Sequence, residues 1–210
     1  MIVIGHIFIL GEGSPFMREE LQKYFYALTS VARALRSIGV DFELIGSMVL
    51  PVGYGVYWDV HDVDLFVIGE SPFMNPDKFE ELAGKNDWDV GTSAFGNMYM
   101  EVLAGDSMIR VDLMENALDV YIPSKLLEDS LEAAIGEDKI KAMRVEGLIV
   151  LKAREATDEA EEFLEELNER LSSSSIRLDK KKILSFINEY PSDERKSLRH
   201  RIEMAGIYLD

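Results

Sequence analysis

The chain has 210 residues, an apolar fraction of 47%, no cysteine and a formal net charge of −17 at neutral pH. This length and apolar fraction predict one large globular domain, or one domain with a helical annex. The lack of cysteine excludes disulfides and thiolate zinc sites, and three scattered histidines give poor support to a histidine zinc site. The strong negative charge disfavours long nucleic acid as a partner, because its phosphates are repelled.

The first predicted element is a strand over the apolar residues 1–10. This run is too short to span a bilayer and lacks the basic leader of a secretory signal, so we expect a cytoplasmic protein. Apolar residues then recur at helical spacing from residue 15 to residue 38, and Gly39 ends this helix. A short strand over 42–45 follows and leads into Gly46 and Ser47.

The middle of the chain alternates between strands and turns. Residues 53–60 carry Tyr54, Tyr57 and Trp58 and predict a loop or lid, in which these rings either stack on a base or pack on the protein. A strand containing Asp62 and Asp64 comes next, and a short helix is expected over 76–83. Three more strands are predicted over 88–92, 98–103 and 108–113.

Beyond Pro123 the pattern becomes helical, with helices expected over 124–135, 145–154 and 157–171. The four serines 172–175 are the best candidate for a linker. The sequence therefore predicts a first domain over 1–122 and a helical region over 123–210.

The residues that carry chemistry are acidic and lie on predicted strands. Alternate residues of a strand point to one face, so Asp62 and Asp64 leave the same side. On the 108–113 strand, Arg110 and Asp112 share the face opposite the apolar residues. If the two strands are neighbours, Asp112 completes a carboxylate trio suited to Mg²⁺ or Mn²⁺.

These residues resemble a known signature. Gly46-Ser47, then Asp62-Val63-Asp64, then Asp112 is similar to the pattern of the DNA polymerase β-like nucleotidyltransferase superfamily. The resemblance implies an α+β fold, in which a mixed sheet is flanked by helices and followed by a C-terminal helical region. It also implies that the three aspartates bind metal and catalyse transfer from a nucleoside triphosphate such as ATP, while Gly46 and Ser47 hold its phosphates.

A closer resemblance covers the helical region. Residues 122–127 and 145–154, followed by Asp158 and Glu161, are similar to the AbiEii-type group of small stand-alone nucleotidyltransferases. In that group a lysine faces the nucleotide phosphates, and Lys152 matches its position. The acceptor stays open between a small molecule, a protein and a tRNA end.

Two other functions remain possible at this point. One is a non-catalytic module of the same fold that binds nucleotide or protein, for example as a toxin–antitoxin-like partner. The other is a metal-dependent phosphohydrolase, which the scarcity of histidine disfavours, because His61 beside the acids is interpreted as structural. The aspartates themselves have a structural alternative, as solvated residues at the edge of a half-buried strand.

Overall fold

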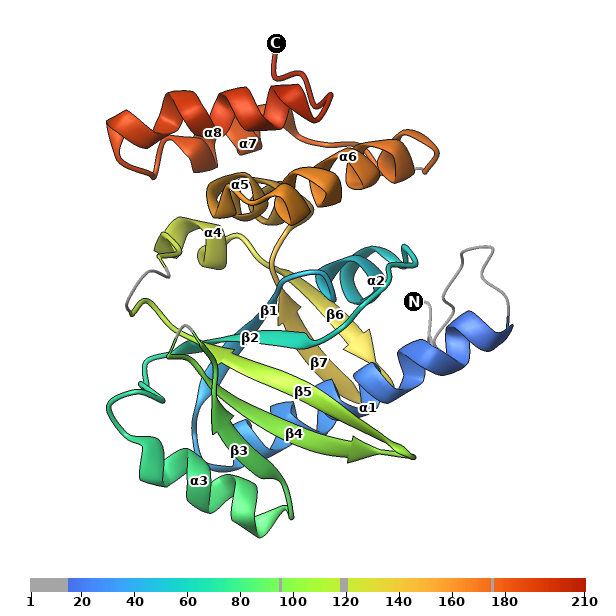
Figure 1. Cartoon of the computed structure of the whole chain (residues 1–210), viewed down its shortest axis with the longest axis vertical. Helices are drawn as coiled ribbons and strands as arrows, with labels where there is room; N and C mark the ends of the chain where they lie inside the picture. Colours follow the sequence, from blue (N-terminus) through green and yellow to red (C-terminus); the bar gives the residue numbers. More distant parts are fainter. Residues whose placement is uncertain (1–14, 95, 118–120, 175) are drawn as a thin grey trace. The chain divides into compact units, whose positions relative to one another are not determined.

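A mixed sheet forms the centre of the fold in a computed structural model that describes residues 15–94, 96–117, 121–174 and 176–210. Its strands, in the part of the chain described, are β1 (Asp41–Ile45), β2 (Val63–Ile68), β3 (Asp89–Thr92), β4 (Met98–Ala104), β5 (Ser107–Met114), β6 (Leu131–Ile135) and β7 (Asp138–Ala142). They pair in the order β3-β4-β5-β2-β1-β7-β6 (Figure 1). The β2–β5 and β1–β7 pairs are parallel, and the other pairs are antiparallel.

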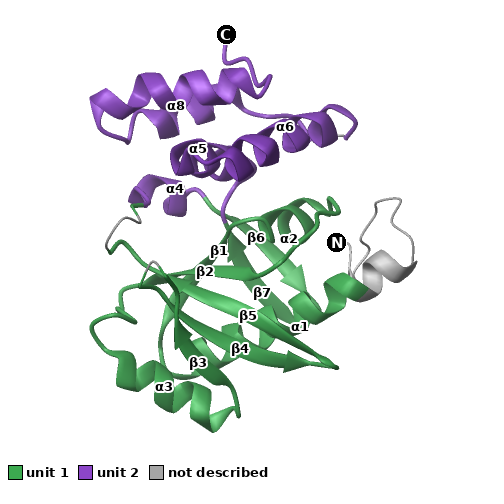
Figure 2. Ribbon diagram, viewed as in Figure 1, with its two compact units in different colours: residues 1–121, 130–142 green, residues 122–129, 143–210 purple. Residues whose placement is uncertain are grey.

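The helices are α1 (Pro15–Ser37), α2 (Val49–Tyr54), α3 (Pro76–Lys85), α4 (Ser124–Glu128), α5 (Val145–Glu155), α6 (Asp158–Ser172), α7 (Lys180–Ile187) and α8 (Ser192–Met204). By their contacts the elements form two compact units, one of residues 1–121 and 130–142, the other of residues 122–129 and 143–210 (Figure 2). The first unit holds the whole sheet with α1, α2 and α3. None of the described helices is long and apolar enough to cross a membrane.

Helix α1 packs against strands β1, β2, β4 and β5. Its buried side chains recur at helical spacing, and they include Leu21, Phe25, Leu28, Val31, Ala32 and Leu35. The strands bury alternate side chains, such as Val111 and Leu113 on β5, which fill the core of this unit. The opposite face of β2 and β5 carries the polar residues Asp64, Arg110 and Asp112.

The second unit is helical. Helix α5 contacts α6, α7 and α8, and its buried Glu146 accepts a hydrogen bond from the backbone amide of Asp179 at 2.9 Å. Asp129, directly after α4, accepts hydrogen bonds from Arg144 at 3.2 Å and from Lys182. These contacts connect the start of α5 and α7 with the end of α4.

The expected α+β fold with a mixed sheet and a C-terminal helical region is confirmed. The strand expected over 1–10 lies outside the described residues. The domain boundary after residue 122 stays a prediction. The linker over residues 172–175 also stays a prediction; Ser172 is the last residue of α6, and Ser175 lies outside the described residues. Both sides of this serine segment belong to the second unit.

The helix expected over 124–135 is wrong beyond Glu128. Residues 131–142 form the β6–β7 hairpin, which joins the sheet because β7 pairs with β1. Gly136, in the two-residue connection between these strands, has a φ of +60°, which glycine adopts without strain. The helix-forming composition of 131–135 was overridden by pairing in the sheet.

Candidate active site

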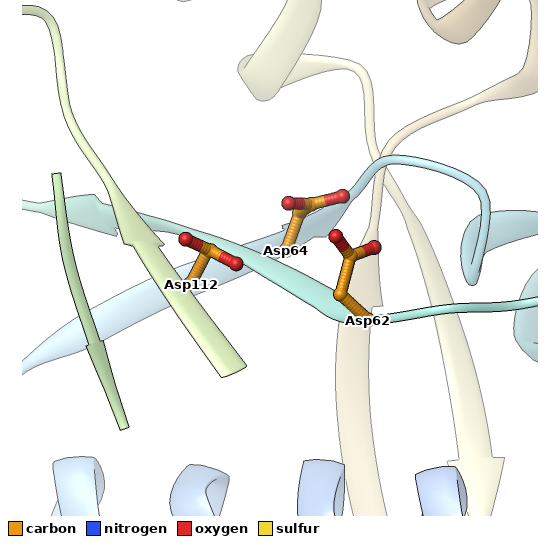
Figure 3. A group of neighbouring side chains, drawn as sticks. All are labelled: Asp62, Asp64 and Asp112. Carbon is orange, nitrogen blue, oxygen red and sulfur yellow. The ribbon is translucent and has the colours of Figure 1, made fainter. Parts of the chain in front are cut away.

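Three aspartates meet on the face of the sheet opposite α1 (Figure 3). Asp64 on β2 lies directly opposite Asp112 on β5 in the parallel register, and Asp62 immediately precedes β2. One carboxylate oxygen from each residue lies within 4.8 Å of the others. The two strands are therefore neighbours, which is the condition on which the carboxylate trio depended, and they bring the three acids together.

The donor set of this trio fits a hard divalent cation. Mg²⁺ binds oxygen ligands at about 2.0–2.1 Å, so two of its ligands lie at most about 4.2 Å apart. Oxygens within 4.8 Å of one another need only small side-chain rotations to share an ion. Like charges at this separation repel, so a cation nearby stabilises the group. The trio can therefore hold Mg²⁺ or Mn²⁺.

Gly46 makes close approach to this group possible. It follows β1 with a φ of +67°, and a Cβ atom there would lie 1.9 Å from Oδ2 of Asp64. Only glycine fits both requirements, because other residues strain at this φ and would collide with the carboxylate. Ser47 is half-buried in the turn after Gly46, and α2 begins two residues later without a side-chain cap. The structure thus places the Gly46-Ser47 turn against Asp64.

Asp112 has a cationic partner within its own strand. Arg110 donates from Nε to Oδ2 at 2.7 Å and from Nη2 to Oδ1 at 2.5 Å. These hydrogen bonds raise the pKa of Arg110, and the charge of Asp62 acts in the same direction. The sequence showed that Arg110 and Asp112 share a face, but it did not show that the guanidinium engages both carboxylate oxygens.

The aromatic loop divides into buried and partly open positions. Trp58 is 5% exposed and packs in the protein, which excludes it as an open stacking surface. A pocket of about 210 Å³ is lined by α1 residues and by residues 57–61, directly before Asp62. Tyr24 lines this pocket, and burial together with Asp59, Asp62 and Glu20 raises the pKa of its hydroxyl. The acids therefore influence groups outside the trio.

Lys152 lies on α5 in the second unit. Its ammonium group binds Glu155 at 2.9 Å and lies 5.3 Å from the centroid of the Phe163 ring. The side chain is 23% exposed. Its role toward a phosphate stays a prediction.

Comparisons with known proteins identify the family of the chain. A family model described as "Nucleotidyl transferase of unknown function (DUF2204)" matches residues 24–204. No curated protein matches the chain. Among solved structures, a nucleotidyltransferase-like protein from Paracoccidioides brasiliensis has 11% identity and a TM-score of 0.53, and covers 90% of this chain and 98% of its own.

Two other structures are more distant in shape. The antibiotic-resistance factor ANT(2'')-Ia has 15% identity and a TM-score of 0.49, covering 86% of this chain and 89% of its own. JHP933 from Helicobacter pylori has 14% identity and a TM-score of 0.44, covering 90% and 91%. At 11% identity, the structure from Paracoccidioides brasiliensis bears on the fold alone.

Proposed function

Because the chain belongs to the DUF2204 family of nucleotidyl transferases, we propose that it transfers a nucleotide with the help of Mg²⁺ or Mn²⁺. The substrate is a nucleoside triphosphate, ATP or another, and the acceptor is a hydroxyl group. The acceptor oxygen attacks the α-phosphorus, the bond from that phosphorus to the bridging oxygen breaks, and pyrophosphate leaves. The observation that carries this proposal is the convergence of Asp62, Asp64 and Asp112 on one face of adjacent strands.

Each site residue has a role in this reaction. Asp62, Asp64 and Asp112 would hold the metal, and Asp112 would also help to deprotonate the acceptor hydroxyl. When bound there, a divalent cation would supply charge neutralisation for the transferred phosphoryl group. The turn of Gly46 and Ser47 would hold the β- and γ-phosphates. The separate prediction for Lys152 is that it acts toward a phosphate as a point charge.

The acceptor is a small molecule, a protein or a tRNA end. The net charge of −17 supports these over long nucleic acid, because an acidic surface repels an extended run of phosphates. The aspartates contribute to this negative charge, and bound metal offsets it locally.

The proposal predicts that Asp62→Asn and Asp64→Asn each abolish metal-dependent transfer. Asparagine keeps the size of the side chain but removes the negative charge that binds a divalent cation. Purified variants are assayed for release of pyrophosphate from labelled NTPs with candidate acceptors. Asp106→Asn, at an exposed position in the turn between β4 and β5, is the matched control and should retain activity.

The assay also separates the other functions. Calorimetry with Mg²⁺ and each NTP should detect binding to the wild type, whereas no binding would favour an interaction module. Orthophosphate as the product, in place of pyrophosphate, would favour a phosphohydrolase. Transfer that survives unchanged in both aspartate variants would refute the assignment.

A further inference from the structure

A single row of residues crosses the sheet at the level of the acids. Gly91 on β3 is directly opposite Tyr99 on β4, Tyr99 is opposite Asp112, and Asp112 is opposite Asp64. Directly opposed residues of neighbouring strands point to the same face. The side chain of Tyr99 therefore leaves the sheet on the face of the acids, next to Asp112.

The position of Tyr99 depends on the absence of a side chain at Gly91. A Cβ atom on Gly91 would lie 2.3 Å from both Cζ and Oη of the Tyr99 ring, closer than real Cβ contacts. The ring therefore rests on the backbone of β3. This contact fixes where the ring lies.

Arg110 connects this ring to the acids. Its guanidinium carbon lies 4.2 Å from the centroid of the Tyr99 ring, within the range of a cation–π contact. The same guanidinium donates to both oxygens of Asp112, at 2.7 Å and 2.5 Å. Gly91, Tyr99, Arg110 and Asp112 thus form a continuous stack across three strands, which we call the Gly91–Asp112 stack.

We propose that Arg110 is a positioning residue for Asp112, and that Tyr99 and Gly91 hold Arg110 in place. This inference rests on the proposed function, because it assigns the stack to the third carboxylate of that site. A planar guanidinium with two parallel N–H groups sets the plane of a carboxylate, which the point charge of a lysine does not. Each oxygen of Asp112 keeps a second lone pair for another ligand.

The benefit of such a stack is preorganisation. Asp112 has a side chain 8% exposed, whereas that of Arg110 is 40% exposed and needs a second contact to stay in one rotamer. The Tyr99 ring supplies that contact. Partners that orient metal ligands typically contribute 10- to 100-fold in metal affinity or activity.

Three substitutions test the stack without changing any charge in the site. Gly91→Ala pushes the Tyr99 ring away, and Tyr99→Leu removes the ring without adding bulk to β3. Gly84→Ala, in α3, is the matched control because a Cβ atom there meets nothing within 4 Å. Arg110→Lys keeps the positive charge on a half-exposed side chain but removes the two parallel N–H donors of the guanidinium.

Electron paramagnetic resonance of the protein with Mn²⁺ alone gives the dissociation constant for the metal, independently of activity. We expect this constant to rise about tenfold in Gly91→Ala, Tyr99→Leu and Arg110→Lys, and to change less than twofold in Gly84→Ala. With NTP and acceptor, kcat should fall in the same three variants while KM for the NTP stays within about threefold. Thermal unfolding of each variant shows that it is folded.

Coupling between the residues gives the sharpest test. If Gly91 acts through Arg110, then Gly91→Ala should have little further effect on Mn²⁺ binding in an Arg110→Lys background. If the effects of Gly91→Ala and Arg110→Lys on the Mn²⁺ dissociation constant are fully additive, the proposal is wrong. It is also wrong if folded Tyr99→Leu and Arg110→Lys proteins bind Mn²⁺ as tightly as the wild type. Absence of Mn²⁺ binding by the wild type would also overturn it. Mn²⁺ binding that depends on the stack, without nucleotide transfer, would instead refute only the proposed function.

Discussion

Glu43 is a carboxyl group in the interior of the sheet. It lies on β1 with 1% of its surface exposed, and its Oε1 has no hydrogen-bond partner. Burial raises the pKa of Glu43 from its usual 4.5 to about 8, although a hydrogen bond with Ser130 and the charge of Lys141 oppose this shift. The carboxyl group of Glu43 is therefore protonated in the folded protein at neutral pH, because burying the neutral form costs less free energy than burying the charged form.

This predicts a pH-dependent contribution to stability. Between pH 4.5 and about 8 the folded protein binds more proton at Glu43 than the unfolded chain does. The contribution is thus fully present below pH 4.5, and it is lost as pH rises, by up to about 1.4 kcal/mol per pH unit, until pH passes the folded pKa. Urea unfolding of wild type and Glu43→Gln from pH 5 to 9 measures it.

The amide of Glu43→Gln does not titrate, so the difference in free energy of unfolding should shift in favour of the variant as pH rises. Glu101→Gln, at a half-buried position of β4, serves as the control and should run parallel to the wild type. A constant difference between wild type and Glu43→Gln from pH 5 to 9 would contradict the raised pKa.

Gly46 offers a second prediction for a single residue. Gly46→Ala places a methyl group 1.9 Å from Oδ2 of Asp64, so the carboxylate must move and Mn²⁺ binding should weaken by tenfold or more. Gly39→Ala is a matched control, since Gly39 has a similar φ of +75° but meets nothing within 4 Å. Both variants should lose about 1–2 kcal/mol of stability from backbone strain. Equal Mn²⁺ affinity in the two variants would show that Asp64 does not contribute to binding.

At the scale of the elements, the sequence was most informative where side chains alternate strictly. Asp62 and Asp64, like Arg110 and Asp112, stand out because polar residues interrupt apolar runs at every second position. That pattern predicts the strand and the face, but it leaves the adjacency of β2 and β5 as a condition that only the structure meets. The alternating pattern does not determine the register between neighbouring strands. The contact of Tyr99 with Gly91 and Arg110 depends on that register.

The β6–β7 hairpin shows why the sequence did not predict every strand of the sheet. Leu131, Glu132, Ala133 and Ala134 are residues with good or neutral helix propensity, and a short segment has no strong period of its own. Strand β6 pairs with β7, and this hairpin joins the sheet only because β7 pairs with β1, which is about a hundred residues earlier in the chain. Local reasoning cannot detect such a partner, so it assigned the whole segment to a helix.

At the scale of the whole molecule, this hairpin decides where the chain can be divided. The helical pattern beyond Pro123 predicts a boundary after residue 122, and the strands of the sheet continue through Ala142. Ile140 and Ala142 are fully buried, and Ser130 bonds to Glu43. A fragment ending at residue 122 therefore loses two strands, exposes β1 as an edge and leaves the Glu43 carboxyl without this partner.

We predict that a fragment of residues 1–142 is more stable than a fragment of residues 1–122. Loss of the buried Ile140 side chain alone corresponds to about 2–5 kcal/mol, so the shorter fragment should unfold at a clearly lower temperature and associate through its exposed edge. Circular dichroism melts and size-exclusion chromatography of both fragments measure this. Both retain Asp62, Asp64 and Asp112, so any difference in Mn²⁺ binding reports the integrity of the sheet rather than the loss of a ligand. Equal melting temperatures would instead support a folding boundary at residue 122, with the hairpin as a dispensable addition to a complete core.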